Sequence, residues 1–186
     1  MNLNLDAIFA PPELETERLL IKPVKEAYRE MIFEYLSDHE VRHGMKMPTH
    51  DTPEKQEAWW QKFKIWREEG SALQWVAFLK DSGKYVSLLT IKEIEHNNLR
   101  GEVGYSVAKD EWGKGIGSEG VKCIVEYGFS NVNLHTIRAM ILPSNLASQG
   151  IVKRLGFIQE AHFKECHRYK GGFYDLLQFY RINPEH

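Results

Sequence analysis

The feature that most constrains this chain is a glycine-rich stretch, DEWGKGIGSEG, at residues 110–120. Its four glycines allow the backbone to approach a bound group closely, because no side chain keeps that group away. An amphipathic helical pattern follows directly, with Val121, Ile124, Val125 and Phe129 on one face. Unpaired N–H groups at the start of a helix, together with the helix dipole, favour a phosphate or pyrophosphate. The stretch therefore predicts an anion-binding loop at a helix N-terminus.

Three common phosphate-binding loops fit this stretch poorly. A P-loop requires Lys-Ser or Lys-Thr after its last glycine, whereas Ser-Glu follows Gly117. Residues 115–120 match the dinucleotide pattern GxGxxG, which should directly follow a strand and precede an acidic residue by about 20 positions. Here seven residues separate the preceding apolar strand from Gly115, and residues 135–142 contain no Asp or Glu. The HRD and DFG motifs of a protein kinase are also absent from the sequence.

The segments around the loop predict an α+β fold with a mixed, mostly antiparallel central sheet flanked by helices, in one domain over residues 1–186. Apolar and alternating runs predict strands at 18–24, 72–80, 84–95, 99–108, 136–142 and 173–182, and helical periodicity predicts helices at 25–38, 53–70 and 144–157. Turn residues at 81–83 and 96–98 predict two hairpins. Trp59, Phe63 and Trp66 share one helix face, where we expect core packing.

Composition excludes several classes of protein. The 186 residues are 42% hydrophobic and 27% charged, which is typical of a soluble globular domain. The formal net charge of −2 provides no basic field for nucleic acid. The sequence shows neither an apolar run of membrane-spanning length nor a signal-peptide pattern. The two cysteines, Cys123 and Cys166, form no CxxC pair, and we expect a reducing, cytoplasmic location.

Two motifs, in this order, resemble the GNAT N-acetyltransferase superfamily, and more closely its RimJ/RimL-type branch, which acetylates protein N-termini. The pyrophosphate loop of the superfamily reads Q/R-x-x-G-x-G/A, and Gly115 and Gly117 match its two small positions. Trp112 stands at the Gln/Arg position, where W-G-K-G is common in the RimJ/RimL branch. The second motif, an N-x-x-S helix that ends in L-G-F, is present from Asn145 to Phe157. The resemblance covers nearly the whole chain, from LETERLLIKPV to YDLLQFYRI, and implies the GNAT acyltransferase fold.

The resemblance implies acetyl-CoA as the acetyl donor and coenzyme A as the product. The residues that would bind its pyrophosphate are Trp112, Gly113, Lys114, Gly115, Ile116, Gly117 and Ser118. Val107, at the end of the preceding strand, would offer backbone groups to the pantetheine arm. Its N–H is also a candidate oxyanion donor, a role that can be worth roughly 3–4 kcal/mol. Asn145 would contact the pantetheine or the nearby backbone, and as an Asn it is also suited to cap a helix.

Acetyl transfer to an amine needs a proton acceptor. An α-amino group has a pKa of about 7.7–8.0, against about 10.4 for lysine, so an N-terminal amine is already partly neutral. Glu102, on the strand face opposite Val103 and Tyr105, is the first candidate base, directly or through a water; an exposed carboxylate without a catalytic role is the equal alternative. His135 is a second candidate, since an imidazole titrates near neutral pH, but a cap at the strand entry with no catalytic role is the preferred interpretation. His167 is a third.

The departing thiolate needs little help, because a thiol has a pKa of about 8.5. Many family members use a Tyr seven residues after the motif Asn, and Val152 occupies that position here. RimJ/RimL-like members have a Ser three residues after the Asn, which makes Ser148 the candidate acid. The alternative is that Ser148 is only a small residue on the helix face, without a chemical role. The missing Tyr also leaves open a binding module that keeps the cofactor without turnover.

A rival motif lies at residues 39–43, HEVRH, which matches the zinc-binding HExxH pattern. The pattern requires a rigid helix, whereas Ser37-Asp38 indicates a break and Gly44 follows at once. A polar loop is the better interpretation, and a zinc metalloprotease is the remote alternative.

The acceptor is the least constrained part of the hypothesis. A protein N-terminus of the ribosomal-protein type follows from the resemblance, with a small-molecule amine such as a polyamine or an antibiotic as the alternative. We expect residues 43–50, HGMKMPTH, to line the acceptor side. Neither nucleic acid nor a membrane is expected as a partner, and the resemblance is compatible with a homodimer.

Overall fold

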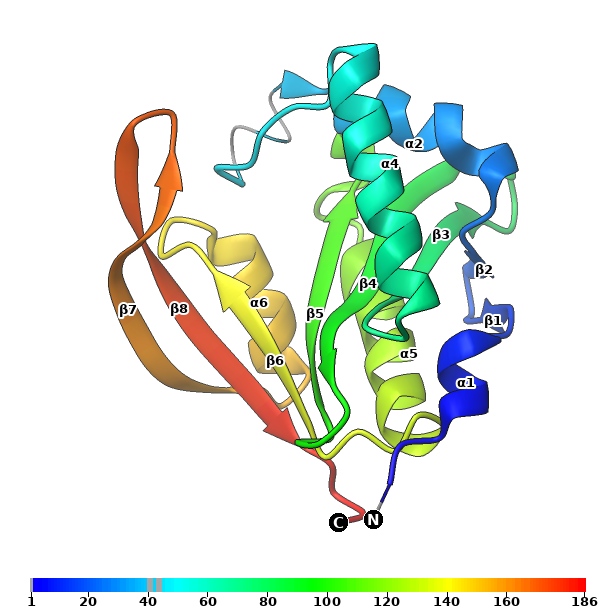
Figure 1. Ribbon diagram of the computed structural model, residues 1–186, viewed down its shortest axis with the longest axis vertical. Coiled ribbons are helices and arrows are strands. Elements are labelled where there is room, and N and C mark those ends of the chain that lie inside the picture. Colours follow the sequence, from blue (N-terminus) through cyan, green and yellow to red (C-terminus); the bar gives the residue numbers. More distant parts are fainter. Residues whose placement is uncertain (1, 40–41, 43–44) are drawn as a thin grey trace.

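The computed structural model describes residues 2–39, 42 and 45–186. Its centre is an eight-stranded sheet in the order β1-β2-β3-β4-β5-β6-β8-β7 (Figure 1). The strands are β1 (Leu14–Glu15), β2 (Leu19–Pro23), β3 (Leu73–Leu79), β4 (Tyr85–Glu95), β5 (Arg100–Val107), β6 (Thr136–Ile141), β7 (Ile158–Tyr169) and β8 (Gly172–Ile182). The helices include α1 (Leu5–Phe9), α2 (Arg29–Leu36), α4 (Pro53–Glu68), α5 (Ile116–Ser130) and α6 (Leu146–Arg154), with 3₁₀ turns at Glu26–Tyr28 and Lys109–Glu111. The predicted mixed, mostly antiparallel sheet is confirmed.

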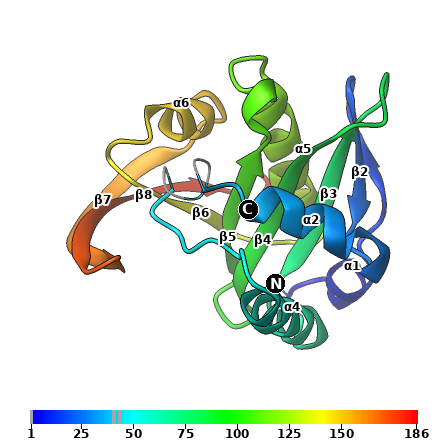
Figure 2. The ribbon, with the colours of Figure 1, turned by 90° about the horizontal axis from the view of Figure 1, so that it is seen from above.

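Helices cover both faces of this sheet (Figure 2). The face toward α5 carries the larger buried cluster, which includes Trp75 and Ala77 of β3 together with Val121 and Ile124 of α5. The opposite face packs on α2 and α4 through a second cluster, to which β3 contributes Val76. Successive side chains of β3 point to opposite faces of the sheet, because a strand has a two-residue period. Since both faces are buried, the sequence of β3 is a nearly continuous apolar run.

Among the α-helices and strands of the described residues, α1, β1 and β7 were not predicted from the sequence. Strand β7 is the edge of the sheet, and most of its residues are exposed. Its sequence, IQEAHFKECHRY, is accordingly polar and lacks the alternation that marks a half-buried strand. The predicted helix at 25–38 is also divided, with a 3₁₀ turn before α2.

The predicted ends of two helices are confirmed by their caps. The side chain of Thr52 accepts a hydrogen bond from the N–H of Lys55, with Pro53 in the first turn of α4, and Gly70 follows that helix at φ +65°. At α6, Asn145 is the N-cap, and Gly156 follows the helix at φ +81°.

Strands β5 and β6 pair for only part of their length, and this positions the site. They are parallel, with Arg100 opposite Thr136 and Glu102 opposite Arg138, and the pairing ends there. Beyond that point the two strands diverge, as Figure 1 shows. The sheet therefore opens between the second halves of β5 and β6. Along the described residues, no helix has both the length and the hydropathy needed to cross a membrane.

Candidate functional site

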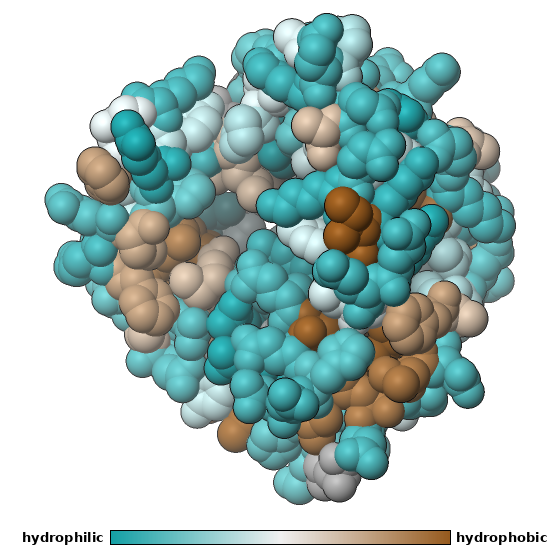
Figure 3. Space-filling view, viewed as in Figure 1, coloured by the Kyte–Doolittle hydropathy of each residue, from teal (hydrophilic) through white to brown (hydrophobic). Residues whose placement is uncertain are grey.

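A cleft of about 700 Å³ lies where the sheet opens. It is bounded by α4 on one side and by β6, β7 and β8 on the other, and the surface is visibly hollowed there (Figure 3). Glu102, Gly104 and Ser106 contribute from β5, and Asn145 and Ser148 contribute from α6. The cleft therefore brings together candidate residues of β5 and of the N-x-x-S motif, whereas the glycine loop at 112–118 is not part of its lining.

The edge of β5 beyond Glu102 offers free backbone groups to this cleft. The N–H of Ala108 donates to the carbonyl of Val86 on β4 at 2.8 Å. Because residues of an antiparallel pair alternate in the direction of their backbone groups, Tyr105 and Val107 direct theirs away from β4, toward the opening beyond the last β5–β6 pair. The carbonyl of Val107 accepts a hydrogen bond from Trp112 Nε1 at 2.7 Å. The half-exposed Trp112 ring thus fixes the turn between β5 and the glycine loop.

The glycine loop ends at the first turn of α5, as predicted. Gly113 and Gly115 have φ of +77° and +82°, in the left-handed region that favours glycine. Gly115 is the N-cap and has no side chain to bond the first amides of α5. The N–H groups of Ile116, Gly117 and Ser118 therefore have no acceptor within the helix. These amides converge beside the end of β5.

Gly117 serves packing more directly than we expected. A Cβ at this position would lie 3.0 Å from Val107 Cγ2 and 3.2 Å from Ile151 Cδ1. Its missing side chain thus lets α5 approach β5 and α6, and the space that a Cβ would need is already taken by Val107 and Ile151. We had expected this glycine mainly to clear the way for a ligand.

Arg18, directly before β2, contacts the glycine loop, and the sequence analysis did not identify this role. Its guanidinium pairs with Glu119 of α5 at 2.6 Å, and its Nη1 donates to the carbonyl of Lys114 at 2.8 Å. Burial opposes the charge on Glu119, but hydrogen bonds from Thr16 and Arg18 outweigh it and lower the pKa of that carboxyl. The result is an ion pair that neutralises a carboxylate in the first turn of α5.

Glu102 is buried, with 6% of its surface exposed, so the exposed-carboxylate alternative is wrong. Its Oε1 lies 2.8 Å from Lys92 Nζ, and its Oε2 accepts a hydrogen bond from Arg138 Nε at 3.2 Å. Arg138 also pairs with Glu93. Two cations thus hold this carboxylate at the point where β5 and β6 separate.

Asn145 and Ser148 lie together at the start of α6. The Oδ1 of Asn145 accepts a hydrogen bond from the N–H of Ser148 at 3.1 Å, so the predicted cap is present. The hydroxyl of Tyr105 donates to the main-chain carbonyl of Ser148 at 3.3 Å. Burial raises the pKa of Tyr105, which keeps its phenol protonated. Tyr105 is therefore a second hydroxyl at the site, and no spacing in the sequence indicated it.

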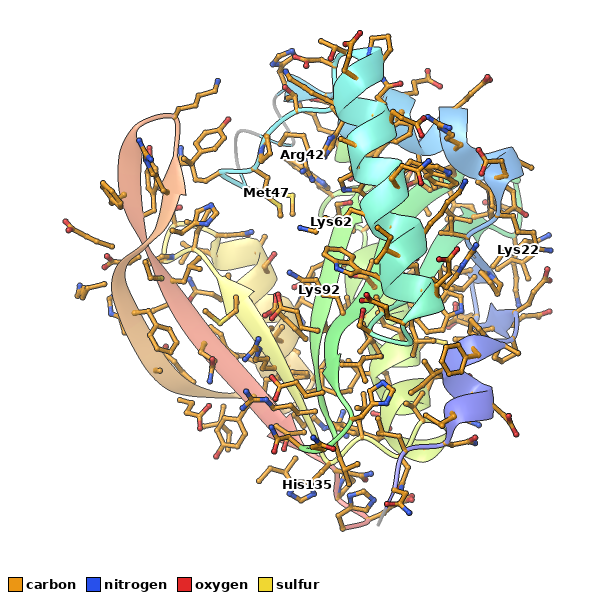
Figure 4. The ribbon with its side chains drawn as sticks, in the orientation of Figure 1. Lys22, Arg42, Met47, Lys62, Lys92 and His135 are labelled. Atoms are coloured by element: carbon orange, nitrogen blue, oxygen red, sulfur yellow. The ribbon has the colours of Figure 1, made fainter. Side chains whose placement is uncertain are left out.

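The structure separates the two histidine candidates. His135 lies at the start of β6, where its ring stacks on His186 at 5.5 Å, and it does not line the cleft. Figure 4 shows it near the chain termini, at the opposite end from Arg42 and Met47. His167 of β7 does line the cleft, and its Nε2 donates to the carbonyl of Lys46 at 2.8 Å.

Aromatic and sulfur-containing side chains form one wall of the cleft. Trp59, Phe63 and Trp66 of α4 line the cleft together with Met45 and Met47. Phe63 also packs in the second core cluster, so the predicted packing role holds for only part of this helix face. Of the segment 43–50, residues 43 and 44 lie outside the described residues.

The HEVRH prediction falls largely outside the described residues, because it includes residues 40, 41 and 43. His39 lies 3.5 Å from Asp51 through its Nε2. Within residues 2–39, 42 and 45–186, no group of three or more His, Cys, Asp or Glu side chains could hold a metal ion.

Comparisons with known proteins show which proteins this chain is similar to. The family model described as "Acetyltransferase (GNAT) domain" matches residues 18–158, which include both motifs. The uncharacterized N-acetyltransferase p20 of Bacillus licheniformis is 27% identical over 173 residues, which are 93% of this chain and 97% of the relative.

Two solved structures share the fold. The ribosomal-protein-S5-alanine acetyltransferase from Vibrio fischeri has a TM-score of 0.82 at 24% identity, over 93% of this chain and 97% of that one. The spermidine N-acetyltransferase from Vibrio cholerae, in complex with CoA and spermine, has a TM-score of 0.80 at 15% identity, over 90% and 97%.

Proposed function

Since this chain belongs to the GNAT acetyltransferase family and is an acetyl-CoA-dependent N-acetyltransferase, we propose that its acceptor is the α-amino group of a protein or peptide. The supporting observation is the charge of the cleft. Among its described lining residues, the cations are Arg42, Lys92 and Arg138, and the carboxylates are Glu93 and Glu102. Both carboxylates already pair with Lys92 or Arg138. A polyamine would bring further positive charges without a free carboxylate to receive them, whereas an α-amino group is partly neutral at pH 7.

The residues around the loop fit a diphosphate. The free amides of Ile116, Gly117 and Ser118 provide donors at the positive end of the α5 dipole. Three carboxylates lie near this loop, and each has a cationic partner: Glu119 pairs with Arg18, and Asp110 and Glu111 both pair with Lys84. In this proposal the β5 edge and Asn145 contact the pantetheine arm. Arg18 positions the loop.

The chemistry assigned to the cleft needs one proton taken and one returned. The carboxylate of Glu102 takes the proton of the attacking amine, directly or through a water, as the new C–N bond forms. The N–H of Val107 faces the opening and donates to the oxygen that gains charge. The hydroxyl of Ser148 gives a proton to the departing sulfur as the C–S bond breaks. His135 takes no part, because it lies away from the cleft.

A thiol-release assay with acetyl-CoA tests the acceptor class. We expect turnover with peptides that carry a free N-terminus and none with the same peptides blocked by an N-terminal acetyl group. Spermidine and an amino sugar serve as the small-molecule arm. Faster turnover of spermidine than of every peptide would overturn the proposed acceptor. If acetyl-CoA binds in calorimetry but none of the amines in the panel causes thiol to be released, the protein is a cofactor-binding module without turnover.

A further inference from the structure

One buried polar atom in the wall of the cleft has no hydrogen-bond partner within the part of the chain that the structure describes. Gln74 of β3 is 4% exposed and lines the cleft. Its Nε2 donates to the carbonyl of Phe63 at 3.4 Å, whereas its Oε1 has no hydrogen-bond partner among the described residues. The carbonyl of Phe63 can only accept, so the amide must present its NH₂ to Phe63 and its oxygen elsewhere.

The unpartnered oxygen distinguishes Gln74 from its neighbours. Buried polar atoms in proteins are nearly always bonded, so an exception needs an explanation. Two other buried atoms lack partners among the described residues, the hydroxyls of Tyr35 and Tyr85, and neither residue lines the cleft. Gln74 Oε1 is thus an acceptor built into the wall of the site and left free for a ligand.

Sheet register places Gln74 relative to the opening. Gln74 pairs with Thr90 of β4, which pairs with Gly104 of β5 at the edge of the opening. The hydroxyl of Thr90 donates to the carbonyl of Gly104 at 3.0 Å, so it is already engaged. Two strand spacings separate the backbones of Gln74 and Gly104, about 10 Å. The Gln74 side chain spans part of this separation, so one acceptor molecule can reach Gln74 Oε1 while its amine is held at the opening.

The surroundings select an uncharged group. Trp59, Phe63 and Trp66 form an apolar wall here, and an unpaired charge is costly to bury in such a place. Lys92 lies two residues beyond Thr90 on the same face of β4, so its ammonium would repel a second cation.

From these observations we infer that the acceptor carries an uncharged hydrogen-bond donor, a hydroxyl or an amide N–H, that binds Gln74 Oε1. This inference rests on the proposed function. A peptide offers such a donor in two places: the hydroxyl of a first Ser or Thr, and the N–H of the first peptide bond. Gln74 is then a specificity-determining residue for the amine acceptor.

Four peptides separate these two sources. One peptide begins with Ser and one with Ala, and both have an ordinary first peptide bond. The other two have the same sequences with an ester in place of that bond, which removes its N–H. We expect the wild-type protein to lose about tenfold in kcat/KM when the recognised donor is absent. A loss from Ser to Ala identifies the hydroxyl, and a loss from amide to ester identifies the N–H.

The variant Gln74→Met removes the acceptor at similar volume, and the tenfold preference should fall to nearly one. A ratio between two substrates does not depend on how much of the variant is folded. Gln56→Met is the matched control, because Gln56 of α4 also donates to a backbone carbonyl, that of His50 at 3.0 Å, but does not line the cleft. This control should keep the wild-type preference.

Two results would overturn the inference while the proposed acceptor class stands. In the first, all four peptides are acetylated equally well by the wild-type protein. In the second, the preference survives in Gln74→Met. If no peptide is acetylated at all, the proposed acceptor class itself fails, and the inference fails with it.

Discussion

Glu102 and Arg138 are the last paired residues of β5 and β6, and their side chains are joined as well, at 3.2 Å from Arg138 Nε to Glu102 Oε2. One ion pair thus marks the point where the sheet opens and holds a carboxylate beside the opening. The position of the candidate base and the position of the cleft therefore have the same structural origin.

The variant Glu102→Gln removes the proton acceptor and keeps the shape of the side chain. We expect kcat to fall about a hundredfold or more, since general-base effects are usually of that size. The affinity for acetyl-CoA in calorimetry should not change. Glu126→Gln is the control, because Glu126 of α5 pairs with Arg181 and does not line the cleft. Turnover equal to wild type across the pH range would eliminate Glu102 as the base.

Gly115→Ala tests the loop against a matched glycine. Gly115 and Gly83 both have positive φ, +82° and +67°, so an alanine at either should lower the free energy of unfolding by about 1–2 kcal/mol. Gly83 lies in the β3–β4 hairpin with no atom near its added Cβ. We expect only Gly115→Ala to weaken acetyl-CoA binding in calorimetry. Equal affinities in the two variants would contradict the loop assignment.

Arg18→Gln should weaken acetyl-CoA binding through Glu119. Without Arg18, the Glu119 carboxylate would be left unpaired in the first turn of α5 and would repel a diphosphate there. We expect the dissociation constant to rise about two- to fivefold, with kcat nearly unchanged. The double variant with Glu119→Gln should regain affinity.

Lys80→Gln controls for the loss of a nearby surface cation, since Lys80 pairs with Glu15 at 2.9 Å and does not touch the loop. A double variant as weak as Arg18→Gln alone would show that Arg18 does not act through this charge.

Ser148→Ala and Tyr105→Phe compare the two hydroxyls beside α6. The proton of Tyr105 is already donated to the carbonyl of Ser148, which leaves Ser148 as the freer donor. We expect Ser148→Ala to lower kcat about tenfold, at the low end of general-acid effects because a thiol leaves easily. Tyr105→Phe should leave kcat nearly unchanged. Single-turnover measurements of thiol release decide between them, and the reverse pattern would transfer the role to Tyr105.

Stability should depend on pH through His50. Burial, and then the neighbouring Arg42 guanidinium, lowers the pKa of His50 from 6.5 to about 4. The unfolded chain therefore binds a proton at a higher pH than the folded one. The stability that the neutral imidazole provides is fully present above pH 6.5 and is lost as the pH falls toward 4.

Thermal melting between pH 7 and pH 4.5 measures this loss. The variant His50→Gln, which keeps an acceptor for Arg42, should show a flatter pH dependence than the wild-type protein. The exposed His96 provides a control, and His96→Gln should follow the wild-type curve. Parallel curves for His50→Gln and wild type would refute the assignment.

Local pattern was enough to predict the glycine loop before α5, the helices α4, α5 and α6, and six of the strands. Each of these depends on residues close together in the chain: the glycines of the loop, the apolar period of α5, and the Asn145 and Gly156 caps of α6. Strand β7 escaped prediction because an edge strand in water has no apolar face to reveal it.

The site itself depended on strand order, which no local period encodes. The sequence alone placed Glu102 and His135 as alternatives of the same kind, and only the parallel pairing of β5 with β6 set Glu102 at the opening and His135 at the far end. Arg18 meets Glu119 across 101 residues of chain, and Gln74 meets the cleft through two strand pairings. Contacts between residues this far apart are fixed by burial of the whole sheet between its helices, so the sequence determined the parts and their chemistry, and the tertiary structure determined which parts share a site.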